Sequence, residues 1–473
     1  MKKGEKMKSM IAACAALAAF ALPAVQVKMY ETRSGGTIAA VEREIPNCME
    51  EAWNTPCVDL DEATVSHPYT GLGGSFAEAS CRLLMSVPAE CRRAILEDFF
   101  TKKGLNLSMA RLHVGSSDYS STIYCYDDVP DDFEMKHFSI DHDRKEIIPV
   151  VKEALAVNPD IYLFSSPWSP PGWMKTNGGP FGGWMLSKYL EAFCDYYVAY
   201  LKAYLAEGIR IRALTIQNEP ECGRPGSATC QWHPEQESKV AGYLQPPRLK
   251  AAGLDVKIWL WDHNYIGYKR VLDQLKDKTV LDAIDAVAWH PYCSDATMLR
   301  HVRKVHPNLR FEQTEMGPQG DSKKQTMIWW SRIVLDAFNN GCSSFNNWCL
   351  VLDPDGGPNA SEGLDCYGLV TLDPATCAVT PSEQYRVFRH IGPYVDKGAS
   401  VLATSFTTSG YTAGARDLNA VAFRNPDGSD VVVVSCDCAE RPFARRQFQF
   451  KKGGRYYSIS LLPSTITTFV VAP

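Results

Sequence analysis

Between residues 69 and 394, short apolar runs alternate with longer stretches in which apolar residues recur every three or four positions. Short apolar runs of this kind predict strands, and the longer periodicity predicts amphipathic helices. The predicted strands are residues 71–76, 108–114, 161–165, 212–217, 256–261, 286–290, 310–314 and 343–348. Predicted helices between them include residues 90–100, 186–205, 324–338 and 383–390. Eight strands with interleaved helices predict an α/β fold, the (β/α)₈ TIM barrel.

The last part of the chain, residues 395–473, has a different pattern. Runs at 420–424, 431–435, 446–450 and 466–471 are separated by turn sequences such as Asn425-Pro426-Asp427-Gly428. This pattern predicts antiparallel strands. Residues 26–44 are also strand-like, so we expect residues 26–68 to complete a β-sandwich side domain from the other chain end.

Residues 1–25 are typical of a secretory signal peptide. Four lysines precede an uncharged apolar run from residue 9 to 22, which is too short to span a bilayer. We therefore expect a secreted or periplasmic protein. A lipoprotein anchor at Cys14 is less favoured, because it leaves a very short apolar run before the cysteine. No other stretch predicts a transmembrane segment in the mature chain.

The charge and the cysteine content of the chain limit which partners and metal sites we expect. The net charge is −5, from 49 basic and 54 acidic residues, so no excess charge favours nucleic acid or anionic lipid. Export permits disulfides, and 15 of the 16 cysteines follow the predicted signal peptide. Cys222 and Cys230 are a possible pair, as are Cys48 with Cys57 and Cys366 with Cys377, although sequence does not fix connectivity. The cysteines show no zinc-ligand spacing, so we expect no metal site.

Two glutamates follow predicted strands on opposite sides of the barrel. Glu219 ends the fourth strand in Gln217-Asn218-Glu219-Pro220, and Glu315 ends the seventh. Active sites of such barrels lie at the carboxyl ends of the strands, so both carboxylates can converge on one sugar. Each motif alone also fits a structural role, a helix-capping turn or a surface ion pair. Glu312 is a competitor for Glu315, but it lies deeper in the strand.

Further polar and aromatic residues lie on the strands or at their ends. Taken singly, each of these residues would more often have a structural role. Their shared position at the strand ends is what indicates a sugar site. The candidates for substrate binding are Glu78, Arg111, Trp168, Asn218, His290, Tyr292 and Trp348. Arg111 is expected to keep Glu315 ionised, while the pKa of Glu219 should be raised so that it remains an acid.

Several stretches together resemble glycoside hydrolase family 30, most closely its lysosomal glucosylceramidase branch. They are Gly71–Glu78, Ser166–Gly178, Thr215–Pro220, Val287–Tyr292, Thr314-Glu315 and Gly356–Asn359. The resemblance implies a barrel with a β-sandwich built from both chain ends. It also implies that Glu219 is the acid/base, that Glu315 is the nucleophile, and that Asn359 joins the residues lining the sugar pocket. The loop 221–233 and Cys349 depart from the glucosylceramidase branch.

The sequence therefore predicts a retaining β-glycosidase that acts on a β-glucoside of a carbohydrate or glycolipid, in the manner of a glucosylceramidase. An endo-β-1,6-glucanase or an enzyme for β-xylosides or fucosides of the same family is the alternative. A carbohydrate-binding protein without catalysis is disfavoured, because both carboxylates are present. No cofactor is expected, since two carboxylates suffice for this reaction.

Overall fold

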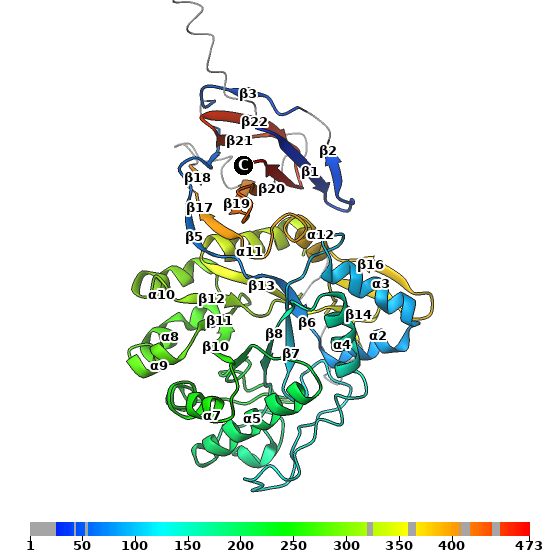
Figure 1. The fold of residues 1–473 in the computed structure, drawn as a ribbon, viewed down its shortest axis with the longest axis vertical. Helices are drawn as coiled ribbons and strands as arrows, with labels where there is room; N and C mark the ends of the chain where they lie inside the picture. Colours follow the sequence, from blue (N-terminus) through cyan, green and yellow to red (C-terminus); the bar gives the residue numbers. More distant parts are fainter. Residues whose placement is uncertain are drawn as a thin grey trace, which may run out of the picture.

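The computed structural model describes residues 25–41, 44–52, 55–318, 325–357, 366–404, 406–407, 417–437 and 445–473. The predicted signal peptide, apart from Val25, and Asn359 lie outside these ranges. The chain forms a β-sandwich stacked on a barrel of strands and helices (Figure 1). This arrangement confirms the predicted fold class.

Eight parallel strands close into a barrel in chain order. All eight predicted strands are present, with ends that differ by a few residues. They are β6 (Gly71–Ser75), β7 (Met109–His113), β8 (Tyr162–Ser166), β9 (Ala213–Thr215), β10 (Lys257–Asn264), β11 (Ala286–His290), β12 (Arg310–Gln313) and β13 (Cys342–Cys349). They are buried almost throughout, as expected for parallel strands covered on both faces. Trp259 and Phe164 fill the interior with smaller neighbours.

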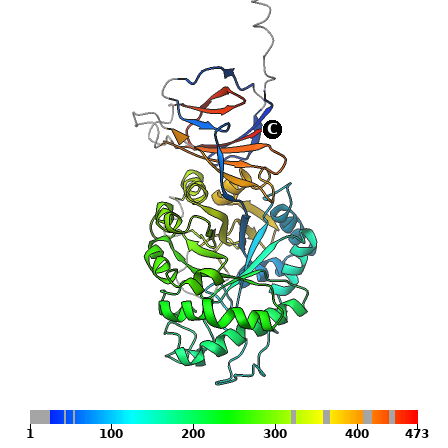
Figure 2. The ribbon, with the colours of Figure 1, turned by 60° about the vertical axis from the view of Figure 1, so that its left-hand side comes forward.

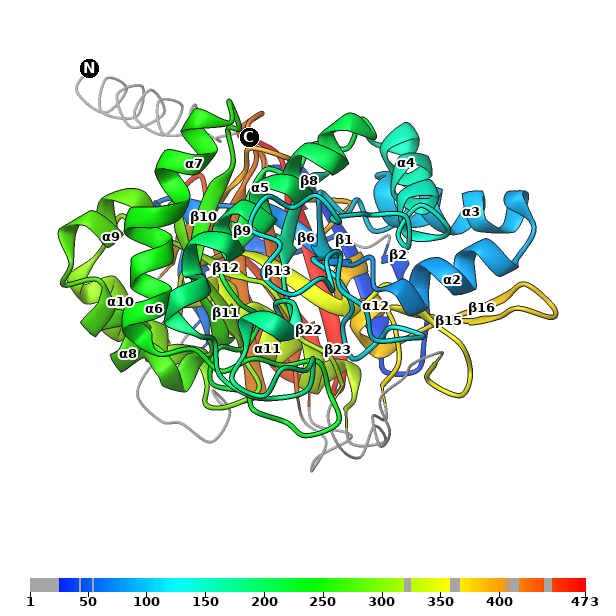
Figure 3. The same ribbon diagram turned by 90° about the horizontal axis from the view of Figure 1, so that it is seen from below.

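Helices surround the strands (Figure 3). They are α2 (Glu78–Ser86), α3 (Ala89–Phe100), α4 (Ile147–Val157), α5 (Leu190–Ala206), α6 (Pro234–Lys239), α7 (Gln245–Ala251), α8 (Tyr268–Gln274), α9 (Lys278–Ala283), α10 (Leu299–Val305), α11 (Met327–Asn339) and α12 (Glu383–Arg389). Side-chain caps define where two of the predicted helices begin. Thr326 accepts a hydrogen bond from Trp329 N at the start of α11, and Ser382 accepts one from Tyr385 N at the start of α12.

Both chain ends build the sandwich, whose seven-stranded sheet places β1 beside β23. This sheet contains, in spatial order, β2 (Ala39–Val41), β1 (Val27–Arg33), β23 (Thr465–Val471), β20 (Asp430–Cys436), β19 (Leu418–Arg424), β17 (Ser400–Ala403) and β5 (Thr64–Pro68). The facing sheet contains β18 (Phe406–Thr407), β4 (Cys57–Asp59), β21 (Arg446–Lys452), β22 (Arg455–Leu461) and β3 (Asn47–Cys48). A small third sheet has β14 (Val351–Leu352), β15 (Val370–Asp373) and β16 (Ala378–Pro381).

The sandwich is held on the barrel by buried contacts. The ring of Tyr69 packs on Phe338 of α11 and Phe423 of β19. Nδ1 of His390 lies 2.9 Å from the hydroxyl of Thr468 in β23. Figure 2 shows β5 descending from the sandwich toward the barrel, where β6 begins. Among the described residues, no helix is long and apolar enough to cross a membrane.

The predicted disulfide pairs are not formed: the six cysteines of these pairs, Cys48, Cys57, Cys222, Cys230, Cys366 and Cys377, are free thiols. Cys366 instead contacts Cys349, and Cys377 contacts Cys91, so each thiol has a neighbour from elsewhere in the fold. Cys48 is exposed whereas Cys57 is buried. Cys222 lines a pocket beside Glu219, while the buried thiol of Cys230 lies near Lys175. Nearness along the chain therefore did not indicate which of these thiols lie close together in the fold.

Candidate active site

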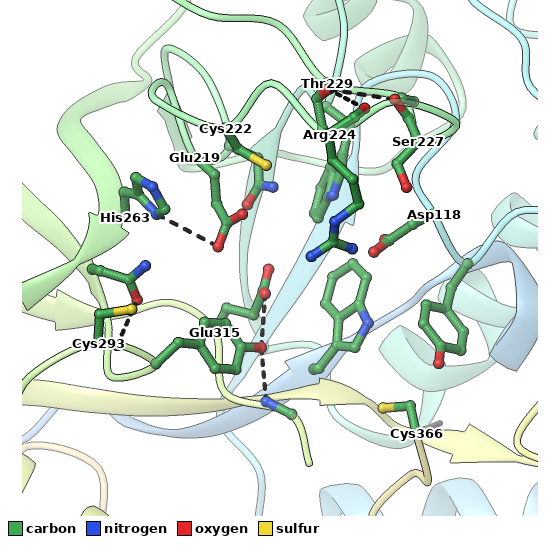
Figure 4. Close-up of a pocket in the computed structure, with 18 of the residues that line it drawn as sticks. Asp118, Glu219, Cys222, Arg224, Ser227, Thr229, His263, Cys293, Glu315 and Cys366 are labelled. Carbon is green, nitrogen blue, oxygen red and sulfur yellow. Dashed lines mark hydrogen bonds and ion pairs between the residues drawn. The ribbon is translucent and has the colours of Figure 1, made fainter. Parts of the chain in front are cut away.

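A pocket of about 230 Å³ opens at the carboxyl ends of the barrel strands. Its walls include Glu219, which follows β9, and Glu315, which follows β12. Figure 4 shows these two side chains reaching into the same space from different sides. The pocket therefore brings together the two carboxylates that the sequence predicted.

The backbone holds Glu219 in an unusual conformation. Its φ is +49°, a region that non-glycine residues seldom adopt, and its N–H donates to Asp262 O at 3.0 Å. Asp262 also has positive φ, at the irregularity where β10 changes register between Trp261 and His263. Strained residues of this kind persist only when their surroundings fix them, and they cluster at functional sites. The backbone hydrogen bond thus connects the segment after β9 to β10, and Glu219 lies beside His263.

Two histidines approach the carboxylate of Glu219. Nδ1 of His290 lies 3.3 Å from Glu219 Oε1, and Nδ1 of His263 lies 3.5 Å from the same oxygen. Burial alone would raise the pKa of Glu219, but the contacts and charge of both imidazoles hold it well below its usual range. The predicted raised pKa is therefore wrong for the free enzyme, because His263 was not foreseen.

The carboxylate of Glu315 is fixed from two sides. Arg111 Nη1 donates to Oε2 at 2.5 Å, and the hydroxyl of Tyr292 donates to Oε1 at 2.9 Å. Gly317 N–H donates in turn to the Tyr292 hydroxyl. Nδ1 of His290 is 3.9 Å from Glu315 Oε1, so one ring nitrogen lies near both carboxylates. Arg111 and Tyr292 thus orient Glu315, and Arg111 forms with it the ion pair that the sequence predicted.

Asp262 connects these groups beneath the pocket, and the sequence analysis did not identify it. Its fully buried carboxylate accepts from Arg111 Nη2 at 2.7 Å and from the hydroxyl of Thr314 at 2.6 Å, and it lies 3.1 Å from His290 Nε2. Burial alone would raise its pKa, but Arg111 and His290 hold the pKa of Asp262 well below its usual range. Asp262 therefore fixes the orientation of both Arg111 and His290.

Aromatic rings form one wall of the pocket. Trp168 and Trp348 both line it, with ring centroids 5.0 Å apart. His113 stacks on Trp348, and the guanidinium of Arg111 lies 4.6 Å from the Trp168 ring centroid. Such a wall suits the apolar face of a pyranose ring.

Asp118 and Arg224 also line the pocket and were missed by sequence reasoning. Burial and the charge of Glu315 raise the pKa of Asp118 to about 7, while Arg224 lowers it. Asp118 Oδ1 has no hydrogen-bond partner among the described residues. Figure 4 shows Arg224 and Asp118 pointing toward one another. An unpaired carboxyl oxygen beside an arginine can receive a sugar hydroxyl.

The remaining candidates divide into two groups. Asn218 lines the pocket, and its side-chain oxygen accepts from Arg111 at 2.8 Å. Glu78 does not line it: this buried side chain accepts from Ser121 at 2.5 Å and lies 3.3 Å from His142 Nε2. Substrate binding by Glu78 is thus not supported by its position. Glu312 is buried against Arg310, away from the pocket lining, which favours Glu315 as the strand-end carboxylate.

Among the described residues, one set of side chains could share a metal ion. The ligand atoms of Glu219, His263 and His290 all lie within 4.8 Å of one another. These residues come from three different strand ends, so no sequence spacing revealed the cluster.

Comparisons with known proteins find relatives that match most of the chain. Residues 69–378 match the Glycosyl hydrolase family 30 TIM-barrel domain. The endo-1,6-β-D-glucanase of Neurospora crassa is 31% identical over 422 residues, covering 85% of each chain. Putative glucosylceramidase 2 of Caenorhabditis elegans is 29% identical over 432 residues, covering 87% of this chain and 83% of that protein. The structure of the endo-β1,6-glucanase BT3312 has a TM-score of 0.83 and 26% identity, covering 94% of this chain and 99% of that one.

Proposed function

Because the chain belongs to glycoside hydrolase family 30 and is a β-glycosidase, we propose that it hydrolyses β-1,6-linked glucan in two steps with retention of configuration. The observation that carries the mechanism is the convergence of Glu219 and Glu315 on one pocket, with different partners. The polar pocket mouth supports glucan as the substrate. Export through the predicted signal peptide would bring the enzyme to such a polymer.

In the first step, an oxygen of Glu315 attacks C1 of the bound sugar and the bond from C1 to the leaving oxygen breaks. Glu219 supplies the proton to that oxygen. In the second step, Glu219 takes a proton from water, whose oxygen displaces Glu315 from C1. Arg111 and Tyr292 hold Glu315 in position for the attack.

The proton for the leaving group is shared by Glu219 and His290. Burial alone would lower the pKa of His290, but the charge of Glu315 and the contacts with Asp262 and Glu219 raise it to about 9. At neutral pH the free enzyme therefore has a protonated His290 beside an ionised Glu219. We propose that Glu219 receives this proton from His290 when the sugar displaces water from the pocket.

The pH profile tests this arrangement. Below about pH 9 the pair retains its proton, and above that pH it loses the proton and Glu219 has none to donate. We expect kcat/KM to fall about 10-fold per pH unit on the alkaline side, with a midpoint near 9. Initial rates between pH 5 and about 11, measured with a chelator present, would show this limb. An alkaline limb that is already complete at pH 7 would contradict it.

The residues at the pocket mouth influence which leaving group can bind. The loop from 221 to 233 contributes Arg224, Ser227 and Thr229 to the pocket lining. Arg224 and its neighbours Gly223, Pro225 and Gly226 are exposed. These groups can bind hydroxyls of a second sugar, whereas a ceramide needs an apolar surface. Glucosylceramide remains the second candidate, favoured by the exposed side chains of Phe181 and Trp184 beside this loop.

Substrate choice is tested with purified enzyme on β-1,6-glucan and on glucosylceramide in detergent micelles. We expect kcat/KM for glucan oligosaccharides to be at least about 10-fold higher than kcat/KM for glucosylceramide. This difference corresponds to about 1.4 kcal/mol of transition-state binding. Arg224→Ala should raise KM for the glucan by about 10-fold with a smaller change in kcat. Arg210→Ala is the matched control, because Arg210 is an exposed arginine paired only loosely with Asp255. Faster cleavage of glucosylceramide would overturn the glucan assignment.

A further inference from the structure

The cluster formed by Glu219, His263 and His290 has the composition of a zinc site with three protein ligands. Zinc in proteins is bound by imidazole nitrogens and carboxylate oxygens, and sites with three protein ligands leave a fourth position open. The two histidines present Nδ1 toward Glu219 Oε1. Histidines and carboxylates are not unusual beside a catalytic acid/base, so the residue types alone do not indicate a metal site. The distances between the ligand atoms decide whether an ion fits.

Two of the three distances between ligand atoms match those around a tetrahedral ion. Two donor atoms bound to one tetrahedral zinc at about 2.0–2.2 Å lie about 3.3–3.5 Å apart. Glu219 Oε1 is 3.3 Å from His290 Nδ1 and 3.5 Å from His263 Nδ1. All three ligand atoms lie within 4.8 Å of one another. Nδ1 of His263 is buried and makes no hydrogen bond within the described residues, so it is available to a cation.

The surroundings hold the ligands in place before any ion arrives. Nε2 of His290 lies 3.1 Å from Asp262 Oδ1, which is the carboxylate–histidine arrangement that orients imidazoles at zinc. The carboxylate of Asp262 itself accepts hydrogen bonds from Arg111 and Thr314. Backbone pairing of Glu219 N with Asp262 O keeps Glu219 next to the chain that carries His263. Little reorganisation is therefore needed for binding.

The open side of the cluster faces the pocket. Glu219 and His263 both line the pocket, and the thiol of Cys222 contacts the Glu219 carboxylate. Figure 4 shows Cys222, Glu219 and His263 grouped on one side of the cavity. A fourth ligand can thus be water or the Cys222 thiolate. The two imidazole nitrogens and the thiolate fit a borderline-soft cation such as zinc better than magnesium or calcium, which prefer all-oxygen ligands.

We propose that Glu219, His263 and His290 form an inhibitory binding site for Zn²⁺ and similar transition-metal cations. A bound ion occupies the lone pairs of Glu219, so this residue can neither give nor take a proton. The ion is not a cofactor, since hydrolysis by two carboxylates needs no metal. The proposal rests on the geometry of these three residues and does not depend on which glycoside is the substrate.

Metal binding is measured directly on tag-free enzyme, by calorimetric titration with Zn²⁺ and by the visible absorption of bound Co²⁺. We expect one ion per chain, a tetrahedral Co²⁺ spectrum, and inhibition of hydrolysis that a chelator reverses. His263→Gln should weaken Zn²⁺ binding by at least about 10-fold. His137→Gln is the matched control: this histidine is largely exposed and pairs with Asp132, far along the chain from the cluster, so its loss should leave Zn²⁺ affinity unchanged.

The readouts separate this inference from the proposed function, because calorimetry and the Co²⁺ spectrum require no substrate. A thermal unfolding curve like that of the wild type shows that His263→Gln is folded, and Glu219→Ala provides a second ligand deletion. The proposal is overturned if the wild type binds no stoichiometric Zn²⁺. It is equally overturned if both ligand variants bind Zn²⁺ as tightly as the wild type does.

Discussion

Glu315→Gln should lower kcat/KM for every β-glycoside by a factor on the order of 10⁴ or more, because an amide oxygen is too weak a nucleophile to form the glycosyl-enzyme. Arg111 keeps Asp262 as a buried counter-charge at 2.7 Å, so the variant should remain folded. Steady-state rates on an aryl β-glucoside would measure the loss, and thermal unfolding would confirm the fold.

The control for this prediction is a glutamate outside the pocket. Glu97→Gln removes a carboxylate that pairs with Arg93 on the exposed face of α3, so activity should stay at the wild-type level. If Glu315→Gln retained more than about a tenth of the wild-type rate, Glu315 would not be the nucleophile.

Glu219→Ala should have a different signature. Rates on glucan should fall by about 10²–10⁴-fold, since the leaving sugar then departs without a proton. Formation of the glycosyl-enzyme from activated aryl glycosides should be spared, because their leaving groups need little acid assistance. Added azide should then restore turnover and yield a β-glycosyl azide, since a small anion fits the space left by the carboxylate and needs no base.

Glu315→Gln provides the internal comparison for the azide experiment. Without Glu315 there is no glycosyl-enzyme for azide to attack on its β-face, so no rescue to a β-azide should occur. Product analysis by mass spectrometry and NMR distinguishes the two variants. Rescue of both variants to the same azide would show that the two roles are not divided as proposed.

The barrel could be predicted from sequence because its strands are buried on both faces and read as short apolar runs. Glu219 and Glu315 could be placed because each ends such a run, and the carboxyl ends of parallel strands meet at one mouth. The sandwich strand β22 was not predicted. Residues Arg455–Leu461 mix serine and tyrosine with aliphatic residues, so they do not form an apolar run. They form a strand by pairing with β21, and the sequence does not indicate this pairing.

The residues that sequence did not reveal depend on local backbone geometry. Asp262 and His263 follow a predicted strand, but their directions are set by an irregularity with positive φ at Trp261 and Asp262. The pKa of Glu219 was predicted in the wrong direction because that irregularity turns His263 toward it. Asp118 comes from the loop after β7, where no periodic pattern indicates which side chains face the pocket.

The stereochemistry of the first product is the sharpest test of the two-step mechanism. A proton NMR time course at the anomeric position follows the sugar released from a β-glucoside before mutarotation mixes the anomers. Two displacements at C1, first by Glu315 and then by water, predict that the β-anomer appears first. Early appearance of the α-anomer would mean a single displacement by water, and it would contradict the mechanism even if both glutamates proved essential.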